Sequence, residues 1–251
     1  MCRYRCGDNR DGDNISIIAV VTGATIGIGK EIVSDLMRNG ATIIIGVRNV
    51  DKGKALSAAL SSKPGGGKIE VLPLDIASME SVRGFAAVVG EAHPALQLLV
   101  NNAGAWFSER GETKEGHELT LATNVLGPHL LTSLLLPQLH TGKPARIVNT
   151  TSGFAGSYDV GDQDWKRRKY TGFKAYSQSK QALRMMTWKL AQRLEGSGVV
   201  ANTVSPGFVK TEFMQNTSGL VTRLIRMISF MADTRKGCGY AVVGGNCPGD
   251  G

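Results

Sequence analysis

Cysteine and histidine are scarce in this 251-residue chain, and neither is arranged for metal binding or disulfide bonding. Cys2 and Cys6 lie in a polar stretch at the amino end, and Cys238 and Cys247 lie in a glycine-rich stretch at the carboxyl end. Because their spacing matches neither a zinc site nor a disulfide framework, we expect reduced thiols, a cytoplasmic protein and no bound metal. The histidines are scattered and receive no role: His93, His117, His129 and His140.

Long apolar runs are also missing. Residues 1–14 form a polar, charged tail without an apolar core, so we expect neither a signal peptide nor a membrane anchor in them. The apolar stretch Leu220–Met231 contains two arginines and is too short to span a bilayer. We interpret it as a helix over a substrate cleft, with a membrane-surface helix as the alternative, so peripheral membrane contact stays open.

Acidic residues are fewer than basic ones, with 21 Asp and Glu against 29 Lys and Arg and a formal net charge of +8. The basic residues are spread along the chain, whereas nucleic-acid binding needs a more organised patch, so we expect no nucleic-acid partner. The densest basic run is Lys166–Lys169. It indicates a solvated face or, alternatively, a contact with an acidic partner or a lipid head group.

Short apolar runs rich in β-branched residues alternate with segments of helical period, and no linker, repeat or composition break divides the chain. Such runs predict buried parallel strands, and the alternation predicts a doubly wound α/β sheet of the Rossmann type, a single domain over residues 15–234. The expected strands are 15–21, 41–47, 69–74, 96–100, 146–149 and 199–204. The expected later helices are 51–60, 78–89, 118–139 and 176–194.

A glycine-rich turn, Thr22–Gly29, connects the first expected strand to an amphipathic helical run. Its glycines let the backbone approach a pyrophosphate closely, and free amides at the start of the helix favour an anion. The spacing is Gly-x-x-x-Gly-x-Gly and not the Gly-x-Gly-x-x-Gly dinucleotide fingerprint, so the match is to a different binding turn. A purely structural turn is the alternative.

Tyr176 and Lys180 are four residues apart, on one face of an expected helix. A phenol is a poor acid near neutrality, and a neighbouring ammonium lowers its pKa, so we expect Lys180 to make Tyr176 usable for proton transfer. Tyr170 and Lys174 have the same spacing, but Gly172 between them is a poor helix residue. The pattern therefore favours Tyr176 as the proton donor.

Arg48 follows the second expected strand, where a dinucleotide fold meets the adenosine ribose. An acidic residue there binds the 2′-hydroxyl of NAD, whereas arginine accommodates the 2′-phosphate of NADP. No acidic residue stands beside Arg48, and we interpret Asp51 as a cap of the next helix. We therefore expect NADPH to be preferred over NADH, although Ile26 occupies a position where some NADP enzymes place a second basic residue.

The order and spacing of these motifs resemble those of the short-chain dehydrogenases/reductases, from about residue 15 to about residue 233. Within that family the chain resembles the retinol dehydrogenase-like branch most closely. Many members of this branch have a membrane anchor, which we do not expect in residues 1–14. The matching segments are Gly46–Asn49, Asn101–Gly104, Arg146–Asn149, the long insertion between Ser152 and Tyr176, and Ala175–Lys180.

The resemblance implies a role for each matching residue. Asn124 resembles the structural and catalytic asparagine, Ser152 the catalytic serine, and Tyr176 with Lys180 the catalytic pair. The residues implied in cofactor binding are Thr22, Gly23, Thr25, Ile26, Gly27, Ile28, Gly29, Arg48, Asp75, Ile76, Asn102, Ala103, Gly104, Tyr176, Lys180, Pro206, Gly207, Val209 and Thr211.

The function implied is that of an NADP-dependent oxidoreductase that interconverts a small-molecule alcohol and its carbonyl. Tyr176 would transfer the proton as general acid or base, and Ser152 would hydrogen-bond the substrate oxygen. Lys180 would bind the nicotinamide ribose, and Asn124 would hold Lys180 through an ordered water. Retinoid-like or other lipophilic aldehydes are favoured by the resemblance alone. The alternatives are a non-catalytic NADP-binding regulator and an inactive, truncated homologue.

Several of these residues also have a purely structural explanation. Ser152 would then be a turn residue, Asn124 a hydrogen-bonding residue inside a helix, and Asp75 a cap for the helix that follows it. Trp106 and Phe107 follow the fourth expected strand, at the mouth of the predicted cleft. They are candidates for substrate contact or for packing.

Residues 235–251 depart from the family pattern, which continues with Pro-Glu-Lys-Gly-Ala and a helix leading into a seventh strand. Here the run is glycine-rich and has no helical period. A shift of reading frame in or before this atypical tail is our hypothesis for the difference. With or without such a shift, we expect the sheet to lack its last strand and the substrate side to lack part of its wall, and a homodimer stays open.

Overall fold

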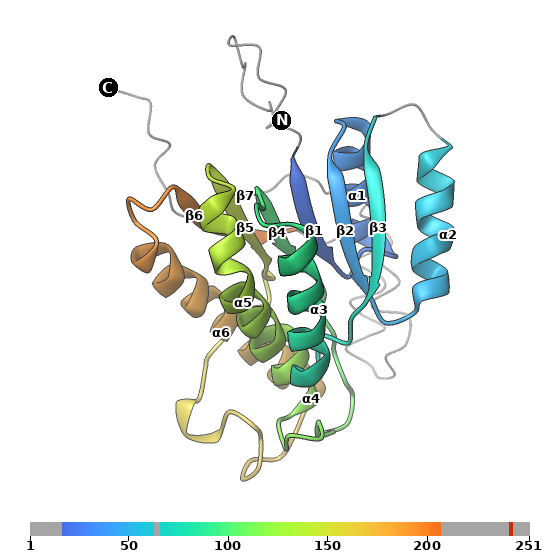
Figure 1. Ribbon diagram of the computed structural model, residues 1–251. Helices are drawn as coiled ribbons and strands as arrows, with labels where there is room; N and C mark the ends of the chain where they lie inside the picture. The colour runs from blue at the N-terminus through green and yellow to red at the C-terminus, as the bar shows by residue number, and fades with distance from the viewer. Residues whose placement is uncertain (1–16, 63–65, 207–240, 243–251) are drawn as a thin grey trace.

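The computed structural model describes residues 17–62, 66–206 and 241–242. Within them, six parallel strands form one sheet in the order β3-β2-β1-β4-β5-β6 (Figure 1). The expected doubly wound Rossmann-type α/β fold is confirmed. The strands are β1 (Ile18–Thr22), β2 (Thr42–Val47), β3 (Lys68–Pro73), β4 (Leu98–Asn101), β5 (Ala145–Thr150) and β6 (Val199–Ser205).

The sheet has a topological switch point between β1 and β4. The chain leaves β1 for β2 on one side, and β4 pairs with β1 on the other side. In open α/β sheets, ligands bind outside the carboxyl ends of the strands at such a point. Thr22, Asn101 and Thr150 end β1, β4 and β5 and therefore mark the edge where a site is expected.

The sheet continues past β6 with a short seventh strand, β7 (Ala241–Val242). It pairs antiparallel with the end of β6, with Val242 opposite Val204. The sequence predicted a sheet without its last strand, and the described residues have this two-residue antiparallel strand where a further parallel strand would lie. The parallel part of the sheet ends at β6.

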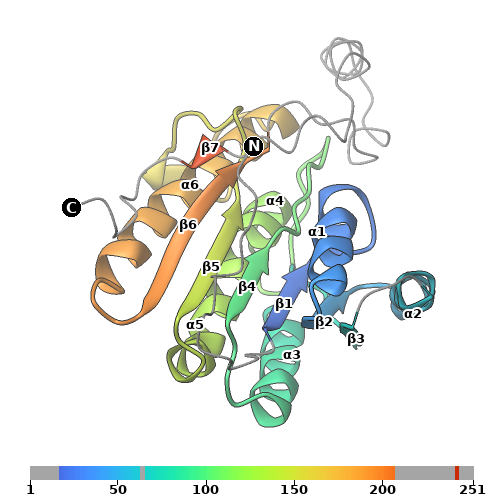
Figure 2. The ribbon, with the colours of Figure 1, turned by 90° about the horizontal axis from the view of Figure 1, so that it is seen from above.

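Helices cover both faces of the sheet, with α3 and α5 on one side and α1 on the other (Figure 2). Apolar residues of α1 and α2 pack on one face, and those of α3, α5 and the end of α6 pack on the other. The helices are α1 (Gly27–Arg38), α2 (Val50–Ser61), α3 (Met79–Ala92), α4 (Leu119–Leu121), the π-helical turn η1 (Ala122–Leu126), α5 (Gly127–Thr141), the 3-10 turn η2 (Val160–Asp162) and α6 (Gly172–Arg193).

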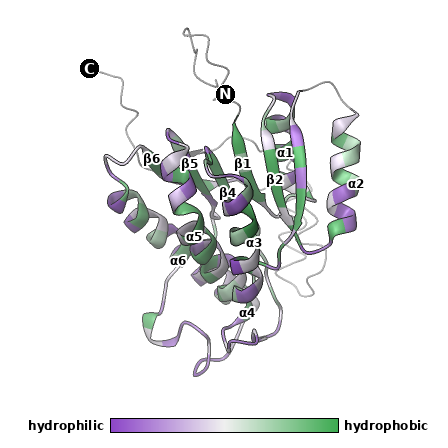
Figure 3. Cartoon of the chain, viewed as in Figure 1, coloured by the Kyte–Doolittle hydropathy of each residue, from purple (hydrophilic) through white to green (hydrophobic). Residues whose placement is uncertain are grey.

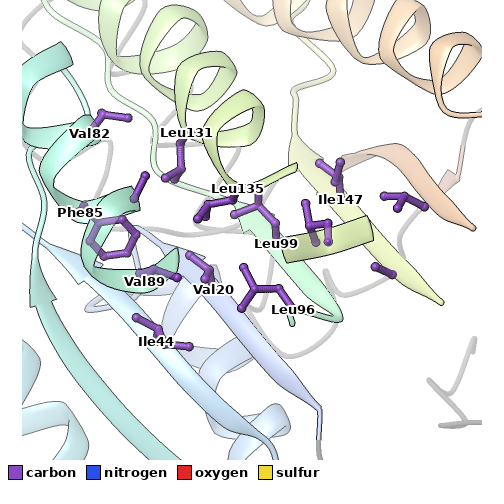
Figure 4. Close-up of a cluster of buried hydrophobic side chains, with 14 of the residues drawn as sticks. Val20, Ile44, Val82, Phe85, Val89, Leu96, Leu99, Leu131, Leu135 and Ile147 are labelled. Atoms are coloured by element: carbon purple, nitrogen blue, oxygen red, sulfur yellow. The ribbon is translucent and has the colours of Figure 1, made fainter. Parts of the chain in front are cut away.

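The apolar strand residues form the core, because a parallel sheet covered on both faces buries both sets of side chains. Figure 3 shows β1 as hydrophobic along its length. Figure 4 shows Phe85 of α3 and Leu131 and Leu135 of α5 meeting Val20 and Leu99 of the sheet. Replacing a fully buried leucine such as Leu135 with alanine is expected to cost about 2–5 kcal/mol.

Strand β3 differs from the buried strand that the sequence predicted. It is an edge strand of the sheet, and Lys68–Val71 alternate between exposed and partly buried positions. The sequence of β3 alternates in the same way, because Lys68 and Glu70 flank Ile69. An edge strand with one solvated face requires this period of two.

The start of α2 also differs from the prediction that Asp51 caps this helix. The cap is Asn49, whose Oδ1 accepts a hydrogen bond from the Lys52 amide over 2.9 Å. Asp51 lies within the first turn, where its negative charge interacts favourably with the positive end of the helix dipole and stabilises the helix. Asn and Asp are equally good caps, so the position of the first helical residue, Val50, decides the outcome.

Among the residues that the structure describes, one helical stretch, Leu119–Thr141, is long and apolar enough to cross a membrane by length and composition alone, and its most apolar 18-residue window has a mean hydropathy of 1.4. It comprises α4, η1 and α5. Of its most apolar window, 61% is buried inside the protein, and Leu131, Leu135 and Leu139 are fully covered. Burial against the sheet explains its composition, because a core helix is apolar for the same reason as a membrane span.

Several predictions concern residues outside the described ranges. They are the tail of residues 1–14, the apolar stretch Leu220–Met231, the cofactor-binding residues Gly207, Val209 and Thr211, and the tail 235–251 apart from β7.

Candidate active site

The turn after β1 has the geometry that its glycines allow. Gly23 and Gly27 have φ angles of +64° and +54°, which side chains rarely tolerate. A Cβ on Gly23 would lie 2.7 Å from Ala103 Cα, and one on Gly29 would lie 2.1 Å from the carbonyl oxygen of Gly23. The turn therefore packs closely against the end of β4 and against the start of α1.

Hydrogen bonds join this turn to the segment after β4. The buried Thr22 hydroxyl accepts from the amides of Asn102 and Ala103, each over 3.1 Å. The Asn102 side-chain amide donates in turn to the Gly23 carbonyl over 3.0 Å. Together these contacts fix the glycine turn against Asn102–Gly104.

The amino end of α1 suits an anion. Its capping residue, Ile26, provides no side-chain hydrogen bond, and the first turn of α1 contains no acidic residue. The first amides of a helix have no partner within it, and the helix dipole adds positive potential there. Thr25 and Ile28 are half-buried in the same turn.

Two further predicted cofactor contacts follow β2 and β3. Arg48 comes directly after β2 and is exposed. Asp75 is exposed, and its Oδ1 accepts from the Ala77 amide over 3.1 Å, while Ile76 is buried. Asp75 is not the cap of α3, because that cap is Ser78. This leaves the Asp75 carboxylate at the strand ends, where the prediction placed it.

Tyr176 and Lys180 lie one turn apart on α6, and both are buried. Lys180 Nζ donates to the carbonyl oxygen of Thr150 over 2.8 Å and lies 5.6 Å from the centre of the Tyr176 ring. A Cβ on Gly104 would lie 3.1 Å from Lys180 Nζ. The lysine therefore connects the end of β5, the segment after β4 and the tyrosine.

Asn124 is fully buried in the π-helical turn η1. Its Oδ1 accepts from the Ala105 amide over 2.7 Å, and its Nδ2 donates to the Ala105 carbonyl and to Ser179 Oγ, each over 2.9 Å. A π-helical turn inside an α-helix often marks a functional site. Here it directs the Asn124 amide toward α6.

Ser152 lies two residues beyond β5, and a hydrogen bond links its side chain to that of Tyr176. Ser152 Oγ also accepts from the Phe154 amide over 3.2 Å. The structure thus brings together the four residues predicted as catalytic, at the carboxyl ends of the strands: Asn124, Ser152, Tyr176 and Lys180. Pro206, half-buried, follows β6 at the same edge of the sheet.

The pKa shifts in this cluster differ from the prediction that Lys180 lowers the pKa of Tyr176. Burial raises the pKa of the Tyr176 phenol, and the Ser152 hydrogen bond opposes this rise only in part. Burial lowers the pKa of Lys180 to about 8. In both groups the loss of water disfavours the charged form.

The competing pair, Tyr170 and Lys174, has a different environment. Tyr170 precedes α6, and its hydroxyl has two acceptors within reach of its single proton, Glu118 Oε1 at 3.2 Å and the Phe107 carbonyl oxygen at 3.1 Å. Lys174 is exposed. This tyrosine therefore stabilises the segment before α4 and does not share a site with its lysine.

A chain of aromatic rings extends from Tyr176. The Trp106 ring stacks on the Tyr176 ring at 5.7 Å between centroids and 19° between planes. Phe173 lies 5.7 Å from Trp106, and Phe154 lies 5.7 Å from Phe173. The sequence indicated Trp106 as a candidate, but it missed Phe173. The position of Phe173, one turn before Tyr176 on the same helix, was the available signal.

The insertion between Ser152 and Tyr176 is built around Asp162. Its carboxylate accepts from the backbone amides of Lys166, Arg167 and Arg168 and from Arg168 Nε. Burial raises its pKa, but these hydrogen bonds outweigh burial and lower the pKa to about 2. Arg168 also stacks over Trp165 at 4.1 Å, so the basic run Lys166–Lys169 is not simply a solvated face.

A doubly wound sheet, a glycine turn after β1 and a buried tyrosine–lysine pair after β5 define a class of Rossmann-type proteins that bind nicotinamide nucleotides. The family model described as short chain dehydrogenase matches residues 17–219. The chain belongs to the short-chain dehydrogenase family.

Relatives agree with the predicted branch. The chain is 38% identical to retinol dehydrogenase 13 of Homo sapiens over 200 residues, which cover 79% of this chain and 60% of that protein. The chain thus spans less than two thirds of the length of that relative. The resemblance to the retinol dehydrogenase-like branch is confirmed.

Solved structures have the same fold. NADPH-bound carbonyl reductase from chicken fatty liver is 25% identical, with a TM-score of 0.66 over 89% of this chain and 88% of that one. The RhlG/NADP active-site complex of Pseudomonas aeruginosa is 28% identical, with a TM-score of 0.66 over 80% of this chain and 76% of that one.

Proposed function

We propose that this protein is an NADP-dependent oxidoreductase that interconverts an alcohol and a carbonyl compound, with Tyr176 as the acid–base residue. One observation supports this most strongly: Tyr176, Lys180, Ser152 and Asn124 meet at the carboxyl ends of β4 and β5. These residues come from parts of the chain up to 56 positions apart, 124 to 180.

The residues after β1 and β2 fit a dinucleotide. A Cβ at Gly23 or Gly29 would clash with the backbone of Ala103 or Gly23, so the glycines let the turn pack tightly, and the first turn of α1 contains no acidic side chain. The first turn of α1 would hold the pyrophosphate, and Arg48, Asp75 and Asn102–Gly104 would line the adenosine and nicotinamide sides. When bound, the reduced cofactor supplies a hydride to the carbonyl carbon.

Tyr176 supplies the proton. Because burial raises its pKa, the phenol is protonated at neutral pH and can donate to the substrate oxygen as that oxygen gains negative charge. The Ser152 hydroxyl donates a hydrogen bond to the same oxygen. Lys180 is mostly protonated at pH 7 because its pKa is about 8, and it would bind the nicotinamide ribose. Asn124 holds α6 in place through Ser179.

The preference for NADPH over NADH rests on Arg48. Its guanidinium follows β2, where a cation pairs with a 2′-phosphate and an acidic side chain would instead accept from a 2′-hydroxyl. The NADP and NADPH complexes among the similar structures support the same choice.

We propose a lipophilic, retinoid-like aldehyde as the substrate class. Trp106, Phe173 and Phe154 form a continuous aromatic cluster beside the Tyr176 ring. An apolar substrate gains burial there, whereas a polar one loses water without gaining partners. The relative named retinol dehydrogenase 13 supports the same class.

The test is consumption of NADPH by the purified 251-residue chain, followed by the loss of reduced-nicotinamide absorbance with retinal, medium-chain aldehydes and small ketones. Turnover is expected, and it should be faster with retinal than with small ketones. NADPH binding without turnover would instead indicate a non-catalytic regulator. Neither binding nor turnover would indicate an inactive, truncated homologue.

A further inference from the structure

We propose that Arg184 is a positioning residue that holds Ser152 beside Tyr176. Arg184 is half-buried on α6, one turn beyond Lys180, and its Nη2 donates to the Ser152 carbonyl oxygen over 3.2 Å. The inference rests on the proposed function, because it concerns the hydroxyl pair that acts on the substrate oxygen.

Two cationic side chains on successive turns of α6 donate hydrogen bonds to backbone carbonyls at the end of β5 and just after it. Lys180 Nζ donates to the Thr150 carbonyl over 2.8 Å, and Arg184 Nη2 donates to the Ser152 carbonyl two residues further on. Hydrogen bonds from charged donors are stronger than neutral ones. The helix that contains Tyr176 therefore also sets the position of the Ser152 backbone.

The far end of the turn after Ser152 is also hydrogen-bonded to α6. The Ser152 carbonyl oxygen accepts from the Ala155 amide over 3.1 Å, which closes the turn. Ser177, directly after Tyr176, donates from Oγ to the Phe154 carbonyl over 2.6 Å. Arg184 and Ser177 thus hold the two ends of one short turn. The contacts of Arg184 and Ser177 together set the position of the Ser152 hydroxyl.

Loss of the Arg184 contact leaves the turn itself intact, because the Ala155 amide still bonds the Ser152 carbonyl. What is lost is the link to α6 at the Ser152 end of the turn, while Ser177 still holds the Phe154 end. The distance between the Ser152 and Tyr176 hydroxyls is then less tightly fixed. Misplacement of a reacting group by about 1 Å can cost on the order of 100-fold in rate. Cofactor binding does not depend on this link, because the glycine turn lies after β1.

The experiment compares Arg184→Met with Lys189→Met, a change of an exposed cation on the same helix. Arg184→Met should lower kcat by about 10- to 100-fold while KM for NADPH changes by less than about twofold. Its kcat should show a larger primary isotope effect with deuterated NADPH, because chemistry becomes slower. Arg184→Lys should recover part of the rate, and Lys189→Met should match the wild type.

Hydrogen–deuterium exchange gives a readout that needs no turnover. Exchange in a peptide spanning residues 152–158 should rise in Arg184→Met and stay unchanged in Lys189→Met. An unchanged kcat in Arg184→Met, or an equal loss in kcat and in NADPH affinity, would overturn the proposal. A wild-type chain without turnover would contradict the proposed function instead. Arg184 would then be judged by exchange alone, and unchanged exchange would overturn its role.

Discussion

The side-chain amide of Asn124 donates a hydrogen bond to Ser179 Oγ over 2.9 Å, across the boundary between η1 and α6. Ser179 Oγ in turn donates to the Tyr176 carbonyl over 2.7 Å. The Asn124 side chain also hydrogen-bonds to the amide and the carbonyl of Ala105. One buried side chain therefore joins the segment after β4 to the helix of the proposed acid–base pair.

Removal of this junction should lower stability as well as rate. Asn124→Ala leaves the half-buried amide and carbonyl of Ala105 and the buried Ser179 Oγ without their Asn124 partner. A fully buried unpaired group costs about 1–3 kcal/mol, and a half-buried one costs less. We expect the free energy of unfolding to fall by about 2–4 kcal/mol in urea titrations. Ser179→Ala, which removes one of these contacts, should have a smaller effect. Equal losses in the two variants would contradict the role of Asn124 as the junction.

A methyl group on Gly23 should reduce NADPH affinity. The residue has a φ of +64°, and the new Cβ would lie 2.7 Å from Ala103 Cα, so the turn and the segment after β4 must separate. We expect Gly23→Ala to weaken binding by about tenfold or more, which corresponds to about 1.4 kcal/mol. NADPH fluorescence titration measures this.

Gly40→Ala is the matched control for Gly23→Ala. Gly40 has a φ of +80°, and a Cβ added there would have no atom within 4 Å. Alanine at this position therefore has the same unfavourable backbone conformation as alanine at Gly23, but no steric clash. Its NADPH affinity should equal that of the wild type. If both variants lose affinity alike, general destabilisation explains the result and not the geometry of the turn.

Reversal of the charge at Arg48 should change cofactor preference. In Arg48→Glu the 2′-phosphate loses a charge-assisted hydrogen bond worth about 1.5–3 kcal/mol, so KM for NADPH should rise by about 10- to 100-fold. KM for NADH should stay level or fall. Lys54→Glu, an exposed change on α2, is the control for net charge. An unchanged ratio of the two KM values would refute the assignment of Arg48.

Lys180 should make stability depend on pH. Its pKa is about 8 in the fold against 10.5 when unperturbed, so between these values the unfolded chain binds more protons and the free energy of unfolding rises with pH. Below pH 8 both states are protonated, and the burial of the charge costs about 3 kcal/mol in full. Lys180→Met should therefore be more stable than the wild type near neutral pH.

Urea titrations between pH 7 and pH 10 measure this effect. The wild type should gain stability from pH 8 upward, and Lys180→Met should show a flatter profile. Lys189→Met, which alters an exposed lysine on the same helix, should keep the wild-type slope. Parallel profiles for wild type and Lys180→Met would show that burial does not shift the pKa of Lys180.

The strands could be predicted from sequence because each is a short β-branched run with turn residues beside it. Ile43, Ile44 and Ile45 of β2, for example, are fully buried, as an unbroken apolar run indicates. Boundaries were harder to predict. Helix α6 begins at Gly172, four residues before Tyr176, although glycine is a poor helix former. Close approach explains it, since a Cβ there would lie 2.2 Å from the Phe107 carbonyl oxygen.

Contacts between distant segments could not be predicted in the same way. No local pattern shows that Arg184 reaches Ser152 or that Arg168 pairs with Asp162, because the path of the insertion decides both. The electrostatic effect of Lys180 on Tyr176 was also misjudged. Spacing along a helix indicates that two residues are neighbours, but the pKa of each depends on how much water the surrounding fold removes.

The most direct test of Tyr176 as the acid–base residue is the single-turnover rate of NADPH oxidation by Tyr176→Phe. The variant keeps the ring that stacks on Trp106 and removes only the hydroxyl that would give the proton. We predict a rate at least about 100-fold below wild type, with NADPH affinity unchanged. Tyr170→Phe, the matched change in the competing pair, should keep the wild-type rate. A Tyr176→Phe variant that retains most of the wild-type rate would contradict the account.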